Sequence, residues 1–130
     1  RGRVKSLKTE ELGELVGSPY ADVRIFAGQT LLTADQEAFD QYGFDLLIDE
    51  DTVVRSTTLR AMGVRRVTGW VRIMSRSLLD EDYVIQRVAM DALLTDRHEG
   101  VKALKEYVAL NPQARISALA RAELDRLGVR

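Results

Sequence analysis

The feature that most constrains the fold of this chain is a repeat of 31 residues. The segment LIDEDTVVRSTTLRAM, which begins at Leu47, returns in altered form as LLDEDYVIQRVAMDAL at Leu78. A shift of 31 residues also aligns three apolar columns: Val23, Val54, Ile85 and Ile116; Ala27, Thr58, Ala89 and Ala120; Leu31, Met62, Leu93 and Leu124. Within each copy these positions are spaced i, i+4 and i+8, which places them on one stripe of an α-helix.

Polar residues indicate where each of these helices begins. One column contains only residue types that are favoured at N-caps: Ser18, Asp49, Asp80 and Asn111. The next contains Pro, which fits the first helical position, or Glu, which faces the positive end of the helix dipole: Pro19, Glu50, Glu81 and Pro112. The stretch before each cap is also apolar on one side. Each unit therefore predicts a first helix, a tight turn and a second helix.

The expected helix spans are 5–17 and 19–32, 34–48 and 50–63, 69–79 and 81–94, and 98–110 and 112–127. Two further signals refine these boundaries. Thr33 and Gln36 have the spacing of a capping box at the start of the second pair, and Gly63 fits the C′ position after its second helix.

A helical pair of this size cannot bury its apolar face alone, so neighbouring units must stack. We therefore predict an all-α fold, a right-handed α-solenoid of about four 31-residue helix–turn–helix repeats. It is expected to form one domain over residues 1–130, with repeats at approximately 5–32, 33–63, 64–94 and 95–127. Polar Lys8 replaces the aromatic residues Phe39 and Trp70, and Glu123 replaces small residues, as terminal units require. We expect the four units to form a complete array.

The repeat resembles the HEAT family of armadillo-like α-solenoids. The string Asp51-x-x-Val54-Arg55-x-x-Thr58-x-x-Ala61-Met62 is similar to the Asp-x-x-Val-Arg-x-x-Ala-x-x-Ala-Leu signature of short, phycobilisome-lyase-type HEAT repeats. The resemblance covers essentially the whole chain. It implies that Arg24 and Arg55 reach turn acids of their own or a neighbouring unit. This ladder is expected to be interrupted where Gln86 and Ser117 replace the Arg.

No pattern in the sequence predicts catalysis, and we expect neither an enzyme nor a cofactor. His98 is the only histidine, and with Asp96 and Glu99 beside it the segment is more typical of a solvated turn than of a metal or catalytic site. There is no cysteine and no H-E-x-x-H spacing for zinc, and no glycine-rich phosphate motif. The acidic triplets 49–51 and 80–82 suit helix N-termini and lack the spacing of a calcium loop.

The outward side of the second helices is the predicted partner-binding surface. In a solenoid these helices usually line the concave side, so the stripe would form a shallow groove for an extended peptide or a helix. The predicted stripe consists of Ile25, Gln29, Ser56, Arg60, Arg87 and Asp91. HEAT-like repeats mostly act as scaffolds, so the leading hypothesis is a non-enzymatic adaptor that binds another protein. It would be a regulatory domain or a subunit of a larger assembly.

Charge placement supports a second hypothesis. Residues 33–51 hold seven acids and no Lys or Arg, whereas residues 52–79 hold six arginines and no acid. Arg65, Arg66, Arg72 and Arg76 are therefore candidate anion-binding residues for a nucleic acid or a phosphate. The alternative is that the two charge blocks pair between adjacent units. Similarly, Phe39, Tyr42 and Trp70 suit either core packing or a platform for stacked bases, and their column favours the core.

Composition adds only broad limits. The net charge is −1, so the overall field does not attract nucleic acid. No stretch approaches the ~20 consecutive apolar residues of a membrane span. We therefore expect a cytoplasmic monomer that does not enter a membrane.

Overall fold

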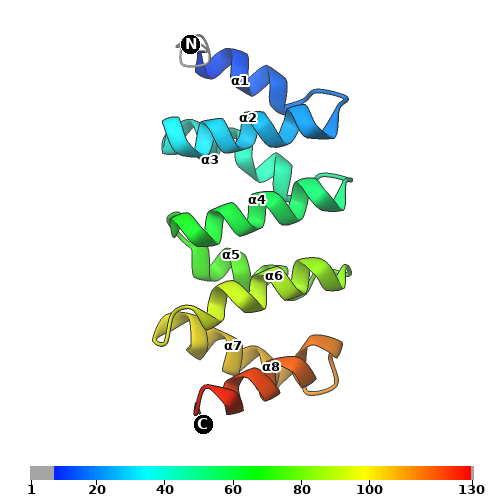
Figure 1. Cartoon of the computed structure of the whole chain (residues 1–130), viewed down its shortest axis with the longest axis vertical. Helices are drawn as coiled ribbons and strands as arrows, with labels where there is room; N and C mark the ends of the chain where they lie inside the picture. The colour runs from blue at the N-terminus through cyan, green and yellow to red at the C-terminus, as the bar shows by residue number, and fades with distance from the viewer. Residues whose placement is uncertain (1–7, 130) are drawn as a thin grey trace. The chain divides into compact units, whose positions relative to one another are not determined.

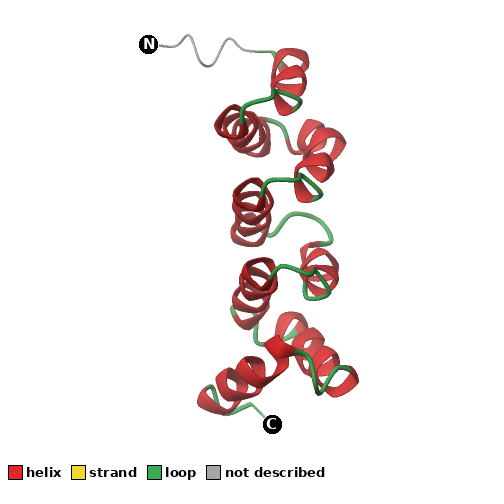
Figure 2. Cartoon of the chain, turned by 90° about the vertical axis from the view of Figure 1, so that its right-hand side faces the viewer, coloured by secondary structure: helices red, strands yellow, loops and turns green. Residues whose placement is uncertain are grey.

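The computed structural model describes residues 8–129, and over that range the chain is helical with no strand (Figure 2). The helices are α1 (Thr9–Val16), α2 (Ala21–Ala34), α3 (Gln36–Leu47), α4 (Thr52–Arg65), α5 (Trp70–Ser77), α6 (Tyr83–Leu94), α7 (Glu99–Leu110) and α8 (Arg115–Arg126). Each overlaps one of the spans expected from the repeat, although residues 5–7 of the first span lie outside the described residues. The all-α prediction is confirmed.

The described residues form two compact units, 8–61 and 62–129, and the boundary between them lies inside α4. In the first unit α2 packs against both α1 and α3, which also contact each other (Figure 1). In the second unit α6 contacts α5, α7 and α8, and α7 contacts α5 and α8. Each unit therefore builds a core from consecutive helices.

The predicted apolar columns supply much of this core. Eleven of their twelve members are buried, and Val23 alone is half-buried: Val54, Ile85 and Ile116; Ala27, Thr58, Ala89 and Ala120; Leu31, Met62, Leu93 and Leu124. Phe39 is also buried, whereas Lys8, at the same place in the first repeat, is exposed. The helical spacing of the columns therefore identified the buried face correctly.

The predicted N-cap positions are wrong, because the second helix of each pair begins two or three residues later than expected. The side chains of Ser18, Asp49 and Asp80 instead close the turn before the helix. Each accepts a hydrogen bond from the backbone N–H two residues later, at 3.1, 2.9 and 2.7 Å. Asn111 differs, since its side-chain amide donates to the Tyr107 carbonyl at 3.0 Å.

The third acid of each triplet, Asp51 or Asp82, caps the helix. The Asp51 carboxylate accepts from the N–H groups of Val53 and Val54 at 2.8 and 3.1 Å, and the Asp82 carboxylate accepts from Val84 N–H at 2.8 Å. Both acids of an Asp-x-Asp sequence can accept backbone N–H groups, so the earlier one forms a turn and the later one satisfies the orphan donors of the helix.

Two other predicted boundaries are wrong. Thr33 lies inside α2, and Asp35 caps α3 by accepting from Ala38 N–H at 3.1 Å. Gly63 lies inside α4, where an added Cβ would be 3.0 Å from the Ala92 Cβ. The missing side chain therefore lets α4 pack closely against α6 at this point. The left-handed residue that ends α4 is Arg66, with φ of 52°. The N–H groups of Arg66 and Val67 donate to the carbonyls of Gly63 and Met62, which is a Schellman motif.

Candidate interaction surfaces

The predicted partner-binding stripe is only partly exposed. Gln29, Arg60, Arg87 and Asp91 are exposed and Ile25 is half-buried. Ser56 is buried, and its Oγ donates to the Val53 carbonyl at 3.2 Å within α4, so its assignment to the stripe is corrected. Leu59, three residues later on the same side of α4, is also buried. The buried face of α4 therefore includes Ser56 and Leu59 as well as the predicted apolar positions Val54, Thr58 and Met62.

Arg87 and Asp91 of this stripe partner each other on α6. The Arg87 Nε and a carboxylate oxygen of Asp91 lie 3.7 Å apart, one helical turn apart in sequence, and both side chains are exposed. Such exposed pairs contribute little to stability. Their charges are available to a partner at small cost.

The candidate anion-binding arginines Arg65, Arg66, Arg72 and Arg76 are all exposed and all belong to the second unit. Arg66 has an internal role, since its guanidinium lies 4.1 Å from the centre of the Trp70 ring and also donates to the Thr95 carbonyl at 3.4 Å. Trp70 is half-buried beneath it. The indole is therefore neither a fully buried core residue nor an open platform for bases.

The sequence did not predict a side-chain contact that occurs in each of the four turns between the two helices of a repeat. We call this contact the turn clasp. In each clasp a side chain donates a hydrogen bond to the backbone carbonyl six residues earlier. The pairs are Arg24 with Ser18 at 2.8 Å, Arg55 with Asp49 at 2.7 Å, Gln86 with Asp80 at 2.5 Å, and Ser117 with Asn111 at 2.7 Å. Replacing the Arg by Gln or Ser therefore leaves the clasp in place.

In the first unit the clasp is joined to an ion pair. The Nε and Nη2 atoms of Arg24 donate to the two carboxylate oxygens of Asp49 at 2.7 and 2.9 Å, and the side chains are only 12% and 9% exposed. Burial favours a higher pKa for Asp49, but the hydrogen bonds from Arg24 and from Asp51 N–H lower that pKa below its ordinary value. The bond to Asp49 raises the pKa of Arg24. The expected contact between an Arg and a turn acid of the next repeat is thus present here.

The turns also expose aliphatic side chains at regular intervals. Ile48, Leu79 and Leu110 occur 31 residues apart, directly after α3, near the end of α5 and at the end of α7, and are 80%, 68% and 81% exposed. Val53 and Val84, at the start of the helices that follow two of these turns, are exposed as well. We call these five the turn-edge residues. Their shared repeat position is visible in the sequence, but their exposure is not.

Two of these turns are adjacent in the second unit. The Tyr107 hydroxyl donates to the Leu78 carbonyl at 3.2 Å, and the Arg115 guanidinium lies 3.9 Å from the centre of the Tyr83 ring. These contacts join the turn after α5 to the turn after α7. Burial raises the pKa of Tyr107, so its hydroxyl remains a proton donor over the ordinary pH range. The turn-edge residues Leu79 and Leu110 therefore belong to one edge of the unit.

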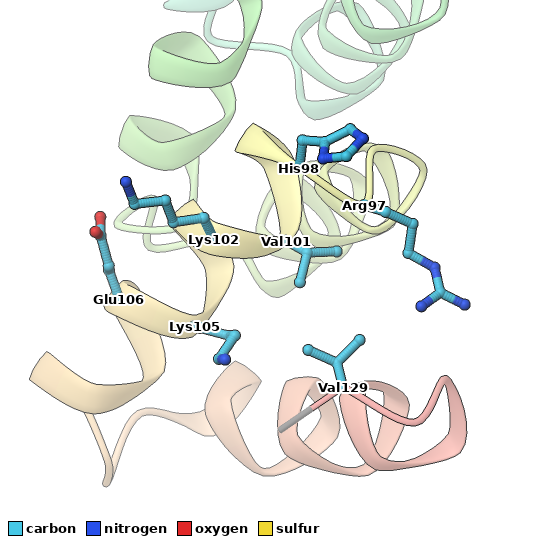
Figure 3. A pocket seen from close by; sticks show the side chains of 7 residues that line it. All are labelled: Arg97, His98, Val101, Lys102, Lys105, Glu106 and Val129. Carbon is cyan, nitrogen blue, oxygen red and sulfur yellow. The ribbon is translucent and has the colours of Figure 1, made fainter.

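The second unit also contains a hollow of about 310 Å³ beside α7, which is lined by Arg97, His98, Val101, Lys102, Lys105, Glu106 and Val129. Figure 3 shows Val101 and Val129 pointing toward each other across it, with Arg97 on one side and Lys105 on the other. The nearby Asp96 has a lowered pKa because its carboxylate accepts from the backbone N–H groups of His98 and Gly100. The hollow thus has an apolar floor and a largely basic wall.

Within residues 8–129, no group of three or more His, Cys, Asp or Glu side chains is arranged to hold a metal ion. In the same range, no helix combines the length and the apolar character needed to cross a membrane. A search for relatives of this chain found no matching family model, no matching curated protein and no matching solved structure.

Proposed function

We propose that this protein is a non-enzymatic protein-protein interaction module with the architecture of a HEAT-like right-handed α-solenoid. It acts as a scaffold or adaptor, as a regulatory domain or a subunit of a larger assembly. The observation that carries the proposal is the exposure of Ile48, Leu79 and Leu110 at one position of the repeat. An isolated exposed aliphatic residue needs no explanation, but three at equivalent turns favour a contact surface.

The chemistry of this edge indicates the kind of partner. Glu50 and Glu81 are exposed beside the aliphatic side chains of their turns. A segment that alternates aliphatic and basic side chains complements such a surface in both polarity and charge. Within the second unit, an extended peptide or a helix could contact the turns of Leu79 and Leu110 in succession. A cytoplasmic, monomeric protein suits this role, and a chain without cysteine suits a reducing compartment.

The test compares two surfaces of the same protein. The turn-edge variant carries Ile48→Asp, Leu79→Asp and Leu110→Asp, and the stripe variant carries Arg60→Glu and Arg87→Glu. The control is Val64→Asp, because Val64 is 77% exposed on α4 but is not a turn-edge residue. Proteins that co-purify with each version from the source cells are quantified by mass spectrometry, and the dissociation constant is then measured with the purified partner.

We expect the turn-edge variant to lose the partner while the control retains it. Substitutions at such exposed sites change stability by only about 0.5 kcal/mol each, so all versions should give the same circular dichroism spectrum. Loss with the stripe variant and retention with the turn-edge variant would move the interface to the predicted groove. Equal binding by all versions would contradict the proposal.

The second candidate function is binding of a nucleic acid or phosphate, favoured by the exposure of Arg65, Arg72 and Arg76. Arg72 and Arg76 are one turn apart on α5, so both can face one anionic strand. Fluorescence anisotropy with labelled single-stranded and duplex DNA tests it. Affinity that falls steeply with salt would support this function, and no binding at low salt would exclude it.

A further inference from the structure

The hollow beside α7 occurs where the repeat loses an aromatic ring. Phe39, Trp70 and Val101 are spaced 31 residues apart; Phe39 is buried and Trp70 is half-buried. Val101 is much smaller, and the hollow of about 310 Å³ lies against it. This volume is at the lower end of the ~300–1,000 Å³ of small ligand sites. The space has a size suited to one large side chain.

The second unit shows how it accommodates rings elsewhere. Arg66 lies four residues before Trp70 and places its guanidinium 4.1 Å from the ring centre. Arg115 covers Tyr83 in the same way at 3.9 Å. Arg97 likewise lies four residues before Val101, is exposed, and lines the hollow. The two connections have different backbones, since Arg66 has a left-handed φ and Arg97 does not. What they share is an arginine four residues before the repeat position that holds a ring in Trp70 and lacks one in Val101.

The charges around the hollow define the rest of the ligand. Its lining contains three basic side chains, Arg97, Lys102 and Lys105, and one acid, Glu106. The neighbouring Asp96 carboxylate already accepts from two backbone N–H groups, at 3.1 and 3.2 Å. A ligand that brings carboxylates beside an aromatic ring therefore matches the wall as well as the floor.

We propose that the hollow binds an aromatic side chain from an acidic peptide segment of a partner protein. The ring packs between Val101 and Val129 with the Arg97 guanidinium against its face. Carboxylates that flank the aromatic residue are attracted by the positive potential of Arg97, Lys102 and Lys105 around the hollow. The part of this site on α7 ends at Glu106, and the site shares no residue with the turn edge, whose Leu110 is the last residue of α7. The two sites are therefore tested independently.

The experiment is an NMR titration of the whole chain, labelled with ¹⁵N, using the peptide N-acetyl-Asp-Glu-Trp-Glu-Asp-amide. We expect saturable shifts confined to the amides of residues 97–106 and of Val129. A peptide with Leu in place of Trp should bind roughly 3-fold more weakly, because it lacks the cation–π contact. A peptide with Lys in place of every acid should not bind.

Variants of the protein locate the site. Val101→Trp supplies the missing ring, as Trp70 does in the preceding repeat, and should abolish the peptide shifts while the spectrum remains that of a folded protein. Arg97→Glu should weaken binding about 10-fold, because it reverses a charge against an acidic ligand. The matched control is Arg121→Glu on α8, since Arg121 is exposed and does not line the hollow. It should bind as the native protein does.

Three results would overturn the proposal. These are shifts spread over the chain, undiminished binding by Arg97→Glu, and the same shifts with inorganic phosphate alone, which would make the hollow a simple anion site. If Val101→Trp does not fold, the pair Arg97→Glu and Arg121→Glu decides the question, since both changes are at exposed positions.

Discussion

The turn before α4 and the turn before α8 use the same clasp with different chemistry. Before α4, the Asp49 carbonyl accepts from Arg55, and the Asp49 carboxylate also receives two hydrogen bonds from Arg24. Before α8, the Asn111 carbonyl accepts from the fully buried hydroxyl of Ser117. A residue with an amide side chain stands in the place of Asp49.

This difference separates what every turn needs from what some turns add. The carbonyl at this position accepts a side-chain hydrogen bond in each of the four turns, and Arg, Gln or Ser can donate it. The ion pair between Arg24 and Asp49 is an addition that also links α2 to the turn between α3 and α4. The following experiments test whether the two contributions are separable.

The largest effect is expected for Asp49→Ala. This change removes both hydrogen bonds from Arg24 and the acceptor for Asp51 N–H, in a place where the Asp49 side chain is only 9% exposed. We expect the free energy of unfolding to fall by about 3 kcal/mol, as measured by urea denaturation. The control is Glu50→Ala in the same turn, since Glu50 is exposed. A loss no greater than that of the control would show that the ion pair is dispensable.

Ser117→Ala tests the neutral form of the clasp. It leaves the Asn111 carbonyl without its side-chain donor at a buried site, so we expect a loss of about 2 kcal/mol in the same assay. Ser77→Ala is the matched control, because the Ser77 hydroxyl also donates to a carbonyl, that of Ile73, but within the helix end of α5. Similar losses in the two variants would mean that the clasp has no special role.

The ion pair can also be transplanted. Gln86 and Asn111 occupy the repeat positions of Arg24 and Asp49, one unit apart in the same order. In a double-mutant cycle, Gln86→Arg combined with Asn111→Asp should show a favourable coupling of about 1 kcal/mol. Purely additive effects would indicate that the second unit cannot bring these positions together as the first unit does.

Acid should distinguish the two forms of the clasp with a smaller effect. Because the pKa of Asp49 is lower in the folded protein than its ordinary value of 3.8, the stability it contributes is complete above that value and is lost as the pH falls through the folded pKa. The urea midpoint of the native protein should fall when the pH is lowered from about 6 to about 3. We expect this fall to be smaller in Arg24→Leu, because the variant lacks the side chain that lowers the pKa of Asp49. An unchanged loss would show that other carboxylates cause the acid sensitivity.

The helices and their buried faces could be predicted because they depend on a local spacing that recurs every 31 residues. The helix starts could not be, since Asp49 and Asp51 are both good caps and only the path of the turn decides between them. The burial of Ser56 and the close approach at Gly63 depend on neighbouring helices, which local spacing does not specify. The hollow lies against Val101, at the repeat position of Phe39 and Trp70; this difference in size is visible in the sequence, but the shape of the surface beside it is not.

The turn clasp also bears on how the chain folds. Each clasp joins residues only six apart, so it closes a short loop and restricts little of the chain. The donor and acceptor of each clasp flank a single turn, so a helical pair can form it before meeting its neighbours. Four such closures along the sequence offer four places where ordering can start. We therefore expect refolding on the microsecond-to-millisecond timescale of proteins with mostly local contacts, measurable by rapid mixing.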